Sequence, residues 1–135
     1  MKEMTLDATL DAIPMITDFI DGELEKLECG LKAQTQIDVA IDEIFSNIAR
    51  YAYGQKTGKA TVQFDFEPET RTVSIGFIDE GEPFNPLEKP DPDVSAPLEA
   101  REIGGLGIFL VKKTMDAVDY ARKGNQNILV LKRII

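Results

Sequence analysis

The stretch EIFSNIARYA, residues 43–52, is the best starting point for interpreting this chain. It closes a longer segment, residues 34–52, in which apolar side chains recur three and four positions apart, as on one face of an α-helix. On such a helix Glu43 and Asn47 lie one turn apart on the same face, which Arg50 continues. An amide oxygen suits magnesium, and a carboxylate can accept a proton from an attacking hydroxyl or water. The alternative is a solvated polar face with an ordinary i, i+4 pair.

The segments on either side show further helix and strand patterns. Residues 3–10 form a candidate edge strand. Residues 12–29 have helical spacing, with Pro14 near the start, where proline is tolerated, and Gly30 in the position of a C-terminal stop. Residues 107–117 return to helical spacing after a long loop.

Two β-hairpins complete the predicted elements. Alternating apolar and polar residues predict strands at 61–66 and 72–77 around the turn 67–70, and at 119–122 and 127–135 around 123–126. The order strand, helix, helix, hairpin, loop, helix, hairpin predicts the α+β class. We expect a single domain, residues 1–135, built as a two-layer sandwich with helices on one face of a mixed, mostly antiparallel sheet.

A second group of polar residues, DEGEPFNP at residues 79–86, follows the strand 72–77. Asp79 shares the parity of the apolar residues of that strand, so it is expected to face the helices. A carboxylate there is costly unless a donor pairs with it, and the exocyclic amine of a purine is such a donor. Gly81 allows close approach or a positive φ. The alternative is a common Asp-x-Gly turn at a strand end.

A third feature is the run GGLGI, residues 104–108, directly before a helix. Glycines at a helix N-terminus let backbone N–H groups point at an anion. The run is neither a Walker A loop nor a Rossmann fingerprint. It follows residues 80–104, whose five prolines exclude a regular helix and whose length predicts a lid. The alternative is a simple hinge for that loop.

The composition excludes several classes of function. The formal net charge of -9 argues against binding nucleic acid or an anionic membrane. Histidine is absent and Cys29 is the one cysteine, so an intrachain disulfide and a zinc site of the CxxC type are excluded. The N-terminus lacks the apolar run of a signal peptide, and no stretch approaches the roughly 20 residues of a membrane span. We therefore expect a cytoplasmic protein.

Taken together and in this order, the three features resemble the GHKL (Bergerat-fold) ATPase superfamily over nearly the whole chain. Residues 43–52, 79–86 and 104–115 look like its N, G1 and G2 boxes. Within the superfamily the chain is most similar to the stand-alone anti-sigma-factor serine kinases of the RsbW and SpoIIAB type. The size, the stretch DEGEPFNP and the sequence GLGI before a lysine-rich helix carry this resemblance.

The resemblance implies a role for each candidate residue. Asn47 would hold Mg²⁺, and Glu43 would be the general base that takes the proton from a substrate serine. Asp79 would bind the adenine amine of ATP, and Gly81 would let the base stack closely. Arg50 resembles the basic residue of histidine kinases and is a candidate phosphate contact.

The same resemblance implies further nucleotide contacts. Gly105 and Gly107 would cradle the phosphates, and residues 85–103 would form the ATP lid. Family members often have a threonine on the last strand near the adenine, where Asn127 is the nearest polar residue of this chain. The implied nucleotide contacts also include Phe84, Gly104, Leu106 and Ile108.

The sequence also departs from the kinase branch. Tyr51-Ala52-Tyr53 stands where that branch has His-Ala-Tyr, and Asn85 replaces an aspartate. The resemblance implies a protein-serine kinase, likewise an anti-sigma factor, that phosphorylates a STAS-type anti-anti-sigma protein, binds a sigma factor and forms homodimers. The alternatives are a non-catalytic ATP-sensing regulator that binds a partner protein, and a histidine-kinase-like catalytic domain acting in trans.

Overall fold

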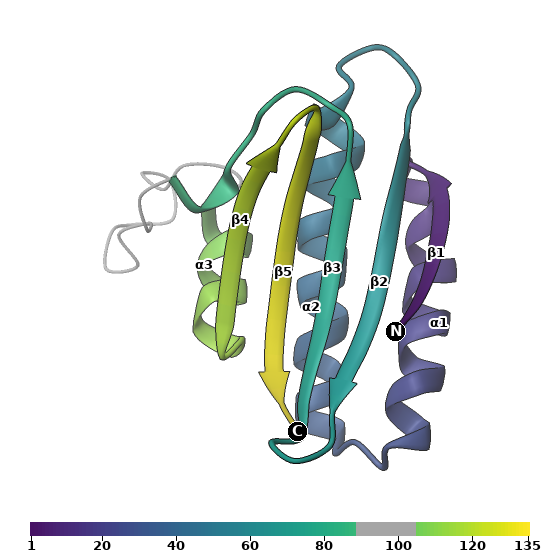
Figure 1. Cartoon of the computed structure of the whole chain (residues 1–135), viewed down its shortest axis with the longest axis vertical. Helices are drawn as coiled ribbons and strands as arrows, with labels where there is room; N and C mark the ends of the chain where they lie inside the picture. The colour runs from purple at the N-terminus through teal and green to yellow at the C-terminus, as the bar shows by residue number, and fades with distance from the viewer. Residues whose placement is uncertain (89–104) are drawn as a thin grey trace.

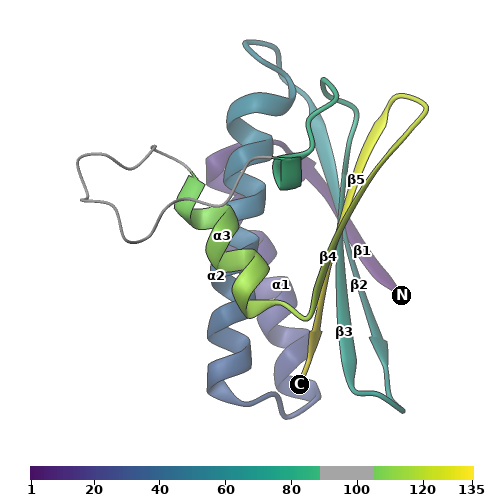
Figure 2. The ribbon, with the colours of Figure 1, turned by 90° about the vertical axis from the view of Figure 1, so that its left-hand side faces the viewer.

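The computed structural model describes residues 1–88 and 105–135, and these form two layers. Three α-helices lie side by side over one face of a five-stranded sheet, and the opposite face of the sheet is open (Figures 1 and 2). This confirms the α+β two-layer prediction. The strands are β1 (Lys2–Asp7), β2 (Lys59–Glu67), β3 (Thr72–Asp79), β4 (Ala117–Lys123) and β5 (Gln126–Ile134), and the helices are α1 (Ile13–Lys26), α2 (Leu31–Asn47) and α3 (Gly105–Thr114), with short turns η1 (Leu10–Ala12), η2 (Ile48–Ala52) and η3 (Pro86–Glu88).

The strands follow the order β1-β2-β3-β5-β4, and each neighbouring pair is antiparallel. The expectation of a mixed sheet is therefore wrong for the described strands. The reason is the path of α3, which carries the chain back to the end of the sheet where β3 begins (Figure 1). The strand β4 then runs along the outside, and β5 returns next to β3 in the opposite direction.

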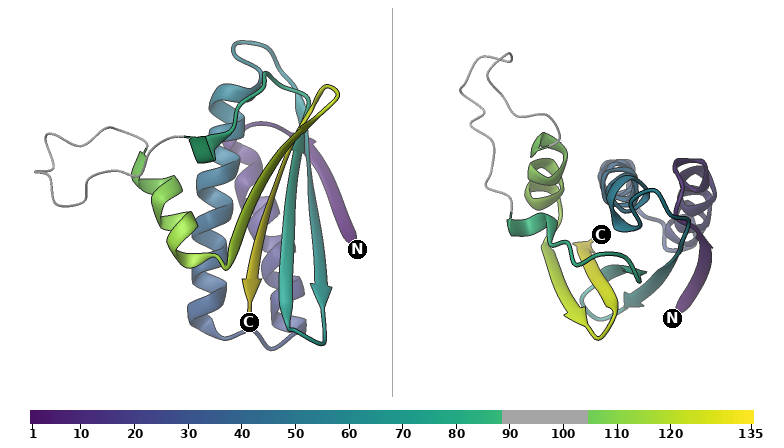
Figure 3. Two further views of the ribbon diagram at one scale, coloured as in Figure 1. Left: turned by 60° about the vertical axis from the view of Figure 1, so that its left-hand side comes forward. Right: turned by 90° about the horizontal axis from the view of Figure 1, so that it is seen from above.

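The helices contact the sheet through the apolar positions that the sequence pattern singled out. Ile16, Ile20 and Leu24 of α1 and Ile37 and Ile41 of α2 are almost fully buried. They pack in one core with the inward-facing residues of the strands and with Ile108, Val111 and Met115 from the α3 region. Seen from above, the three helices form a row over the concave face of the sheet (Figure 3, right).

The ends of two helices differ from the predictions. Gly30 does not stop α1, which ends at Lys26; Glu28 takes the left-handed conformation with φ 56°, and Gly30 is the N-cap of α2. The α-helical part of α2 ends at Asn47, and the chain continues through one π-helical turn, Ile48–Ala52. Such turns widen the helix locally and change the direction of the residues after it.

The last turn of α2, the end of β3 and the start of β5 lie at the same end of the molecule (Figure 1). Residues 80–88, called the arch below, leave the end of β3 and pass along the helix side of the sheet, near the ends of β5 and β4 (Figures 2 and 3). The last turn of α2 lies beside the same arch.

Of the predicted lid, residues 89–103 lie outside the described residues, as does Gly104. In the part of the chain that the structure describes, none of the helices has the length and apolar character needed to cross a bilayer.

Candidate functional site

A cleft and a smaller cavity adjoin each other under the arch of residues 80–88. The cleft has a volume of about 670 Å³, and Glu43, Asn47 and Arg50 line one side of it. The cavity, about 30 Å³, extends towards Asp79 between the helix and the sheet. Asn47, Phe84 and Pro86 line both, so the two form one continuous site.

The polar face predicted for residues 43–52 lies in this cleft. Glu43 and Asn47 project from the last turns of α2, and Arg50 follows from the π-helical turn. Phe84 of the arch and the buried Ile108 of α3 also line it. The cleft therefore places a carboxylate, an amide and a guanidinium beside one another in a space large enough for a phosphate chain.

Glu43 is in close contact with the start of α3. An ideal Cβ atom built on Gly107 would lie 1.9 Å from Glu43 Oε2 and 2.4 Å from its Cδ. The carboxylate thus occupies the space that any larger residue at position 107 would fill. A side chain at position 107 would therefore displace the flexible end of Glu43.

Asp79 is buried at the end of β3, with 5% of its surface exposed, as its parity predicted. Its Oδ1 accepts hydrogen bonds from Gly81 N at 2.9 Å and from Asn127 Nδ2 at 2.9 Å. Asp79 and Asn127 are register partners on β3 and β5. The protein therefore supplies two of the donors that this buried carboxylate needs.

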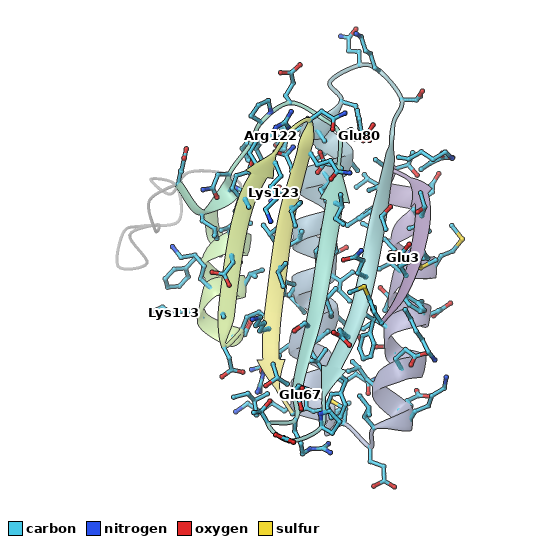
Figure 4. The ribbon with its side chains drawn as sticks, in the orientation of Figure 1. Glu3, Glu67, Glu80, Lys113, Arg122 and Lys123 are labelled. Carbon is cyan, nitrogen blue, oxygen red and sulfur yellow. The ribbon has the colours of Figure 1, made fainter. Side chains whose placement is uncertain are left out.

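Gly81 is required by the backbone of the π-helical turn. A Cβ atom at this position would lie 2.1 Å from the Ala52 carbonyl oxygen, and Glu82 N donates a 2.8 Å hydrogen bond to that same oxygen. Arg122 Nη1 donates to the Gly81 carbonyl oxygen at 2.7 Å. Figure 4 shows Arg122 near the end of β4, at the same end of the sheet as Glu80. The arch is thus attached to the helix layer and to the sheet at one point.

Tyr53 fixes the other side of the arch. Its hydroxyl donates to the Lys59 carbonyl oxygen and accepts from Glu80 N at 2.9 Å. Burial raises the pKa of the Tyr53 phenol, so it stays neutral and able to donate. Its ring also packs on Gly58, where a Cβ atom would lie 2.3 Å from the ring. Tyr53, which keeps the tyrosine of the His-Ala-Tyr pattern, is therefore a structural residue.

The structure brings most of the predicted residues together. Phe84 is partly exposed between the cleft and the cavity, with its ring centroid 6.1 Å from that of Tyr51. Gly105 begins α3, and Leu106 is exposed on its first turn. The binding roles of the predicted residues stay predictions.

Sequence reasoning missed Tyr53, Tyr120 and Arg122, although all three make hydrogen bonds at this end of the sheet. The sequence contained an indirect signal for Tyr120, because its hydroxyl donates to Asn127 and both line the small cavity. Asn127 has the parity of the buried Leu129 of β5. A polar residue at an inward-facing strand position needs a hydrogen-bond partner, as was expected for Asp79.

The side chains that line the cleft fit a magnesium–nucleotide complex better than a metal site formed by protein ligands alone. In residues 1–88 and 105–135 no group of three or more acidic or cysteine side chains is placed to hold a metal ion. Mg²⁺ commonly takes one or two protein oxygens and completes its shell with phosphates and water. The amide of Asn47, in a cleft also lined by Glu43 and Arg50, meets that requirement.

The fold and this cleft define the class of the protein: a GHKL (Bergerat-fold) domain, with helices on one face of the sheet and the site at the end where α2, the arch and α3 meet. The family model described as "Histidine kinase-like ATPase domain" matches residues 6–133. The chain belongs to this family.

Similar proteins agree with this assignment. A serine-protein kinase RsbW from Bacillus mycoides is 24% identical over 136 residues, covering 98% of this chain and 84% of the relative. A protein of the same name from Bacillus cereus is 24% identical over 134 residues with the same coverage. Among solved structures, the histidine kinase domain of the Erythrobacter litoralis EL346 blue-light activated histidine kinase has a TM-score of 0.57 at 12% identity. That match covers 78% of this chain and 46% of the other and concerns the fold.

Proposed function

We propose that this protein is an ATP-dependent protein-serine kinase and anti-sigma factor that phosphorylates a STAS-type anti-anti-sigma protein. The observation that carries the proposal is the Glu43 carboxylate, which lines the cleft beside Asn47 and packs against the start of α3. A domain that only bound nucleotide would need no base at that position. Relatives named serine-protein kinase RsbW, aligned over 98% of the chain, support the same activity.

In this proposal ATP lies along the continuous site. The adenine amine donates to Asp79, and the phosphates extend through the cleft between Arg50 and the start of α3, where backbone N–H groups favour anions. The cavity beside Asp79 has about the volume of one water molecule. A purine therefore fits only when the side formed by Phe84 and Pro86 moves outward.

Mg²⁺ would be held by Asn47 and would neutralise charge on the phosphates. Glu43 would accept the proton of the substrate serine as the serine oxygen forms its bond to the γ-phosphorus. The bond from that phosphorus to the β,γ-bridging oxygen breaks, and ADP leaves with the electron pair. Removing a general base of this kind typically slows a reaction by about 10²–10⁴-fold.

The protein would act in the cytoplasm, bind a sigma factor when its STAS partner is phosphorylated, and work as a homodimer. These partners are proposed from the names of the relatives and from the family resemblance.

Incubation with γ-labelled ATP, Mg²⁺ and a STAS-domain protein tests the kinase activity. We expect label on a serine of the STAS protein, and Glu43→Gln should abolish transfer while ATP still binds. If ATP binds to the parent protein and no serine is labelled, the kinase proposal is wrong and a non-catalytic ATP-sensing regulator takes its place. Equal labelling by Glu43→Gln would remove Glu43 from the role of base.

A further inference from the structure

The side chain of Asn127, only 5% exposed at the start of β5, uses all of its hydrogen-bonding capacity within the protein. Its Nδ2 donates to Asp79 Oδ1 at 2.9 Å and to the Glu82 carbonyl oxygen at 2.8 Å. Its Oδ1 accepts from Phe84 N at 3.3 Å and from the Tyr120 hydroxyl. An amide has two N–H donors and one oxygen with two lone pairs, so no capacity is left for a ligand.

The orientation of this amide is determined by its neighbours. A carboxylate oxygen and the Glu82 carbonyl can only accept, whereas the Phe84 N–H can only donate. Turning the amide over would place acceptor against acceptor and donor against donor. Asn127 therefore links the Asp79 carboxylate to the backbone of Glu82 and Phe84.

In this arrangement one of the two carboxylate oxygens of Asp79 already accepts two hydrogen bonds from the protein. Oδ1 already accepts from Gly81 N and from Asn127 Nδ2, which together use its two lone pairs. Within residues 1–88 and 105–135, no hydrogen bond ends on Oδ2. Asp79 also lines the small cavity. The carboxylate thus has a single oxygen left for a bound molecule.

We propose that Asn127 selects the base of the nucleotide: by occupying Asp79 Oδ1 together with Gly81 N, it leaves Asp79 only one oxygen, Oδ2, to face the base, which favours adenine over guanine. The inference rests on the nucleotide-binding function proposed above and assigns Asn127 a positioning role rather than a contact with the base.

The chemistry of the two bases explains the selection. Adenine presents one exocyclic amine beside a ring acceptor, so one carboxylate oxygen satisfies it. Guanine presents two parallel donors, the ring N1–H and the exocyclic amine, which a free carboxylate would bind with both oxygens, as it binds a guanidinium. With Oδ1 filled, the second guanine donor would be buried without a partner, and a site rejects a ligand that leaves buried polar groups unpaired.

The test compares the dissociation constants of Mg-ATP and Mg-GTP for the full chain, measured by titration calorimetry. For the parent protein we expect ATP to bind about 10- to 100-fold more tightly, the range that one unpaired buried donor produces. Asn127→Leu keeps the branched side-chain skeleton but donates nothing to Asp79. We expect it to reduce the ATP:GTP preference at least about tenfold.

A matched control separates selection from general damage to the site. Tyr120→Phe removes a different hydrogen bond of the same amide and leaves the one to Asp79, so the preference should stay near the parent value. Circular dichroism shows whether Asn127→Leu is folded. If it is not, Asn127→Ser, too short to reach Asp79, is measured in its place with the same expectation.

The remaining outcomes show whether the proposed function or only the inference about Asn127 is wrong. Parent protein that binds neither nucleotide would contradict the proposed function itself. Parent protein that binds ATP and GTP equally would overturn the inference alone. The inference also fails if Asn127→Leu or Asn127→Ser weakens both nucleotides by the same factor, since that is the result expected of a purely structural residue.

Discussion

The Glu43 carboxylate lies where a side chain at Gly107 would be, with Oε2 1.9 Å from the ideal Cβ position. The residue proposed as the base and the glycine proposed as part of the phosphate cradle are thus in direct contact. The absence of a side chain at Gly107 leaves room for the Glu43 carboxylate where α2 and α3 meet. This contact explains the presence of glycine at position 107 without reference to a bound ligand.

Gly107→Ala should lower the phosphoryl-transfer activity without lowering the stability of the fold. The new methyl group moves the Glu43 carboxylate by roughly 1.5 Å, from 1.9 Å to ordinary contact near 3.4 Å. Because this carboxylate ends a flexible side chain, we expect a fold as stable as the parent, aided by alanine's helix propensity, which exceeds that of glycine by about 1 kcal/mol. Phosphoryl transfer to the STAS substrate should fall about a hundredfold, since a 1 Å misplacement of a reacting group has such effects.

Gly22→Ala is the matched control, because Gly22 lies within α1 and a Cβ atom there meets nothing within 4 Å. It should gain about 0.5–1 kcal/mol of stability and keep full activity. Full activity in Gly107→Ala as well would show that the position of Glu43 is not critical.

Gly81→Ala should be destabilising, in contrast to Gly107→Ala. Its Cβ atom would lie 2.1 Å from the Ala52 carbonyl oxygen and 2.5 Å from the Ala52 carbonyl carbon, and both belong to the backbone. Relief requires moving the π-helical turn or the arch, and strain of this kind costs about 1–3 kcal/mol. Urea unfolding followed by far-UV circular dichroism measures the change. A free energy of unfolding equal to that of the parent would show that the arch is not held against Ala52.

A pair of carboxyl groups between α1 and α2 predicts a pH dependence of stability. Asp21 Oδ1 and Asp38 Oδ1 are buried, and no hydrogen-bond donor of the described residues reaches them. Burial, followed by a hydrogen bond with Asp21 and by the charge of Asp21, raises the pKa of Asp38 to about 7 from its ordinary value of 3.8. A single proton shared by the two carboxyl groups would satisfy both oxygens.

The direction of the effect follows from proton binding. Between about pH 4 and pH 7 the folded protein keeps the Asp38 proton that the unfolded chain has released, so this group makes stability fall as pH rises through that range. Asp38→Asn keeps a donor towards Asp21 and carries no charge. Its melting temperature relative to the parent should therefore rise from pH 5 to pH 8. Asp18→Asn, an exposed site on α1, is the control, and an equal difference at both pH values for Asp38→Asn would contradict the account.

Local patterns were sufficient to predict most of the elements and the faces they bury. The apolar spacing of α1 and α2, the alternation along β2 and β3, and the inward parity of Asp79 all appear in the structure. Each depends only on residues within a few positions of one another, which periodicity captures.

Features that depend on distant residues were not predictable in the same way. Asp79 was expected to need a donor from a ligand, but Asn127, 48 positions away, supplies one through the register of β3 with β5. The role of Gly30 was misjudged because Glu28, a residue that rarely takes positive φ, ends the preceding helix. The contact of Glu43 with Gly107 requires α2 and α3 to be packed together, which no local pattern specifies.

The central claim, that ATP binds between α2 and the end of β3, is tested most directly by thermal unfolding with and without Mg-ATP. A ligand that binds only the folded state at about a hundred times its Kd adds about 2.7 kcal/mol of stability. We expect a stabilisation of that size for the parent protein, and the loss of most of it in Asn47→Ala and in Asp79→Ala. The absence of a shift in the parent protein, or shifts in both variants as large as that of the parent, would contradict the assignment of this site.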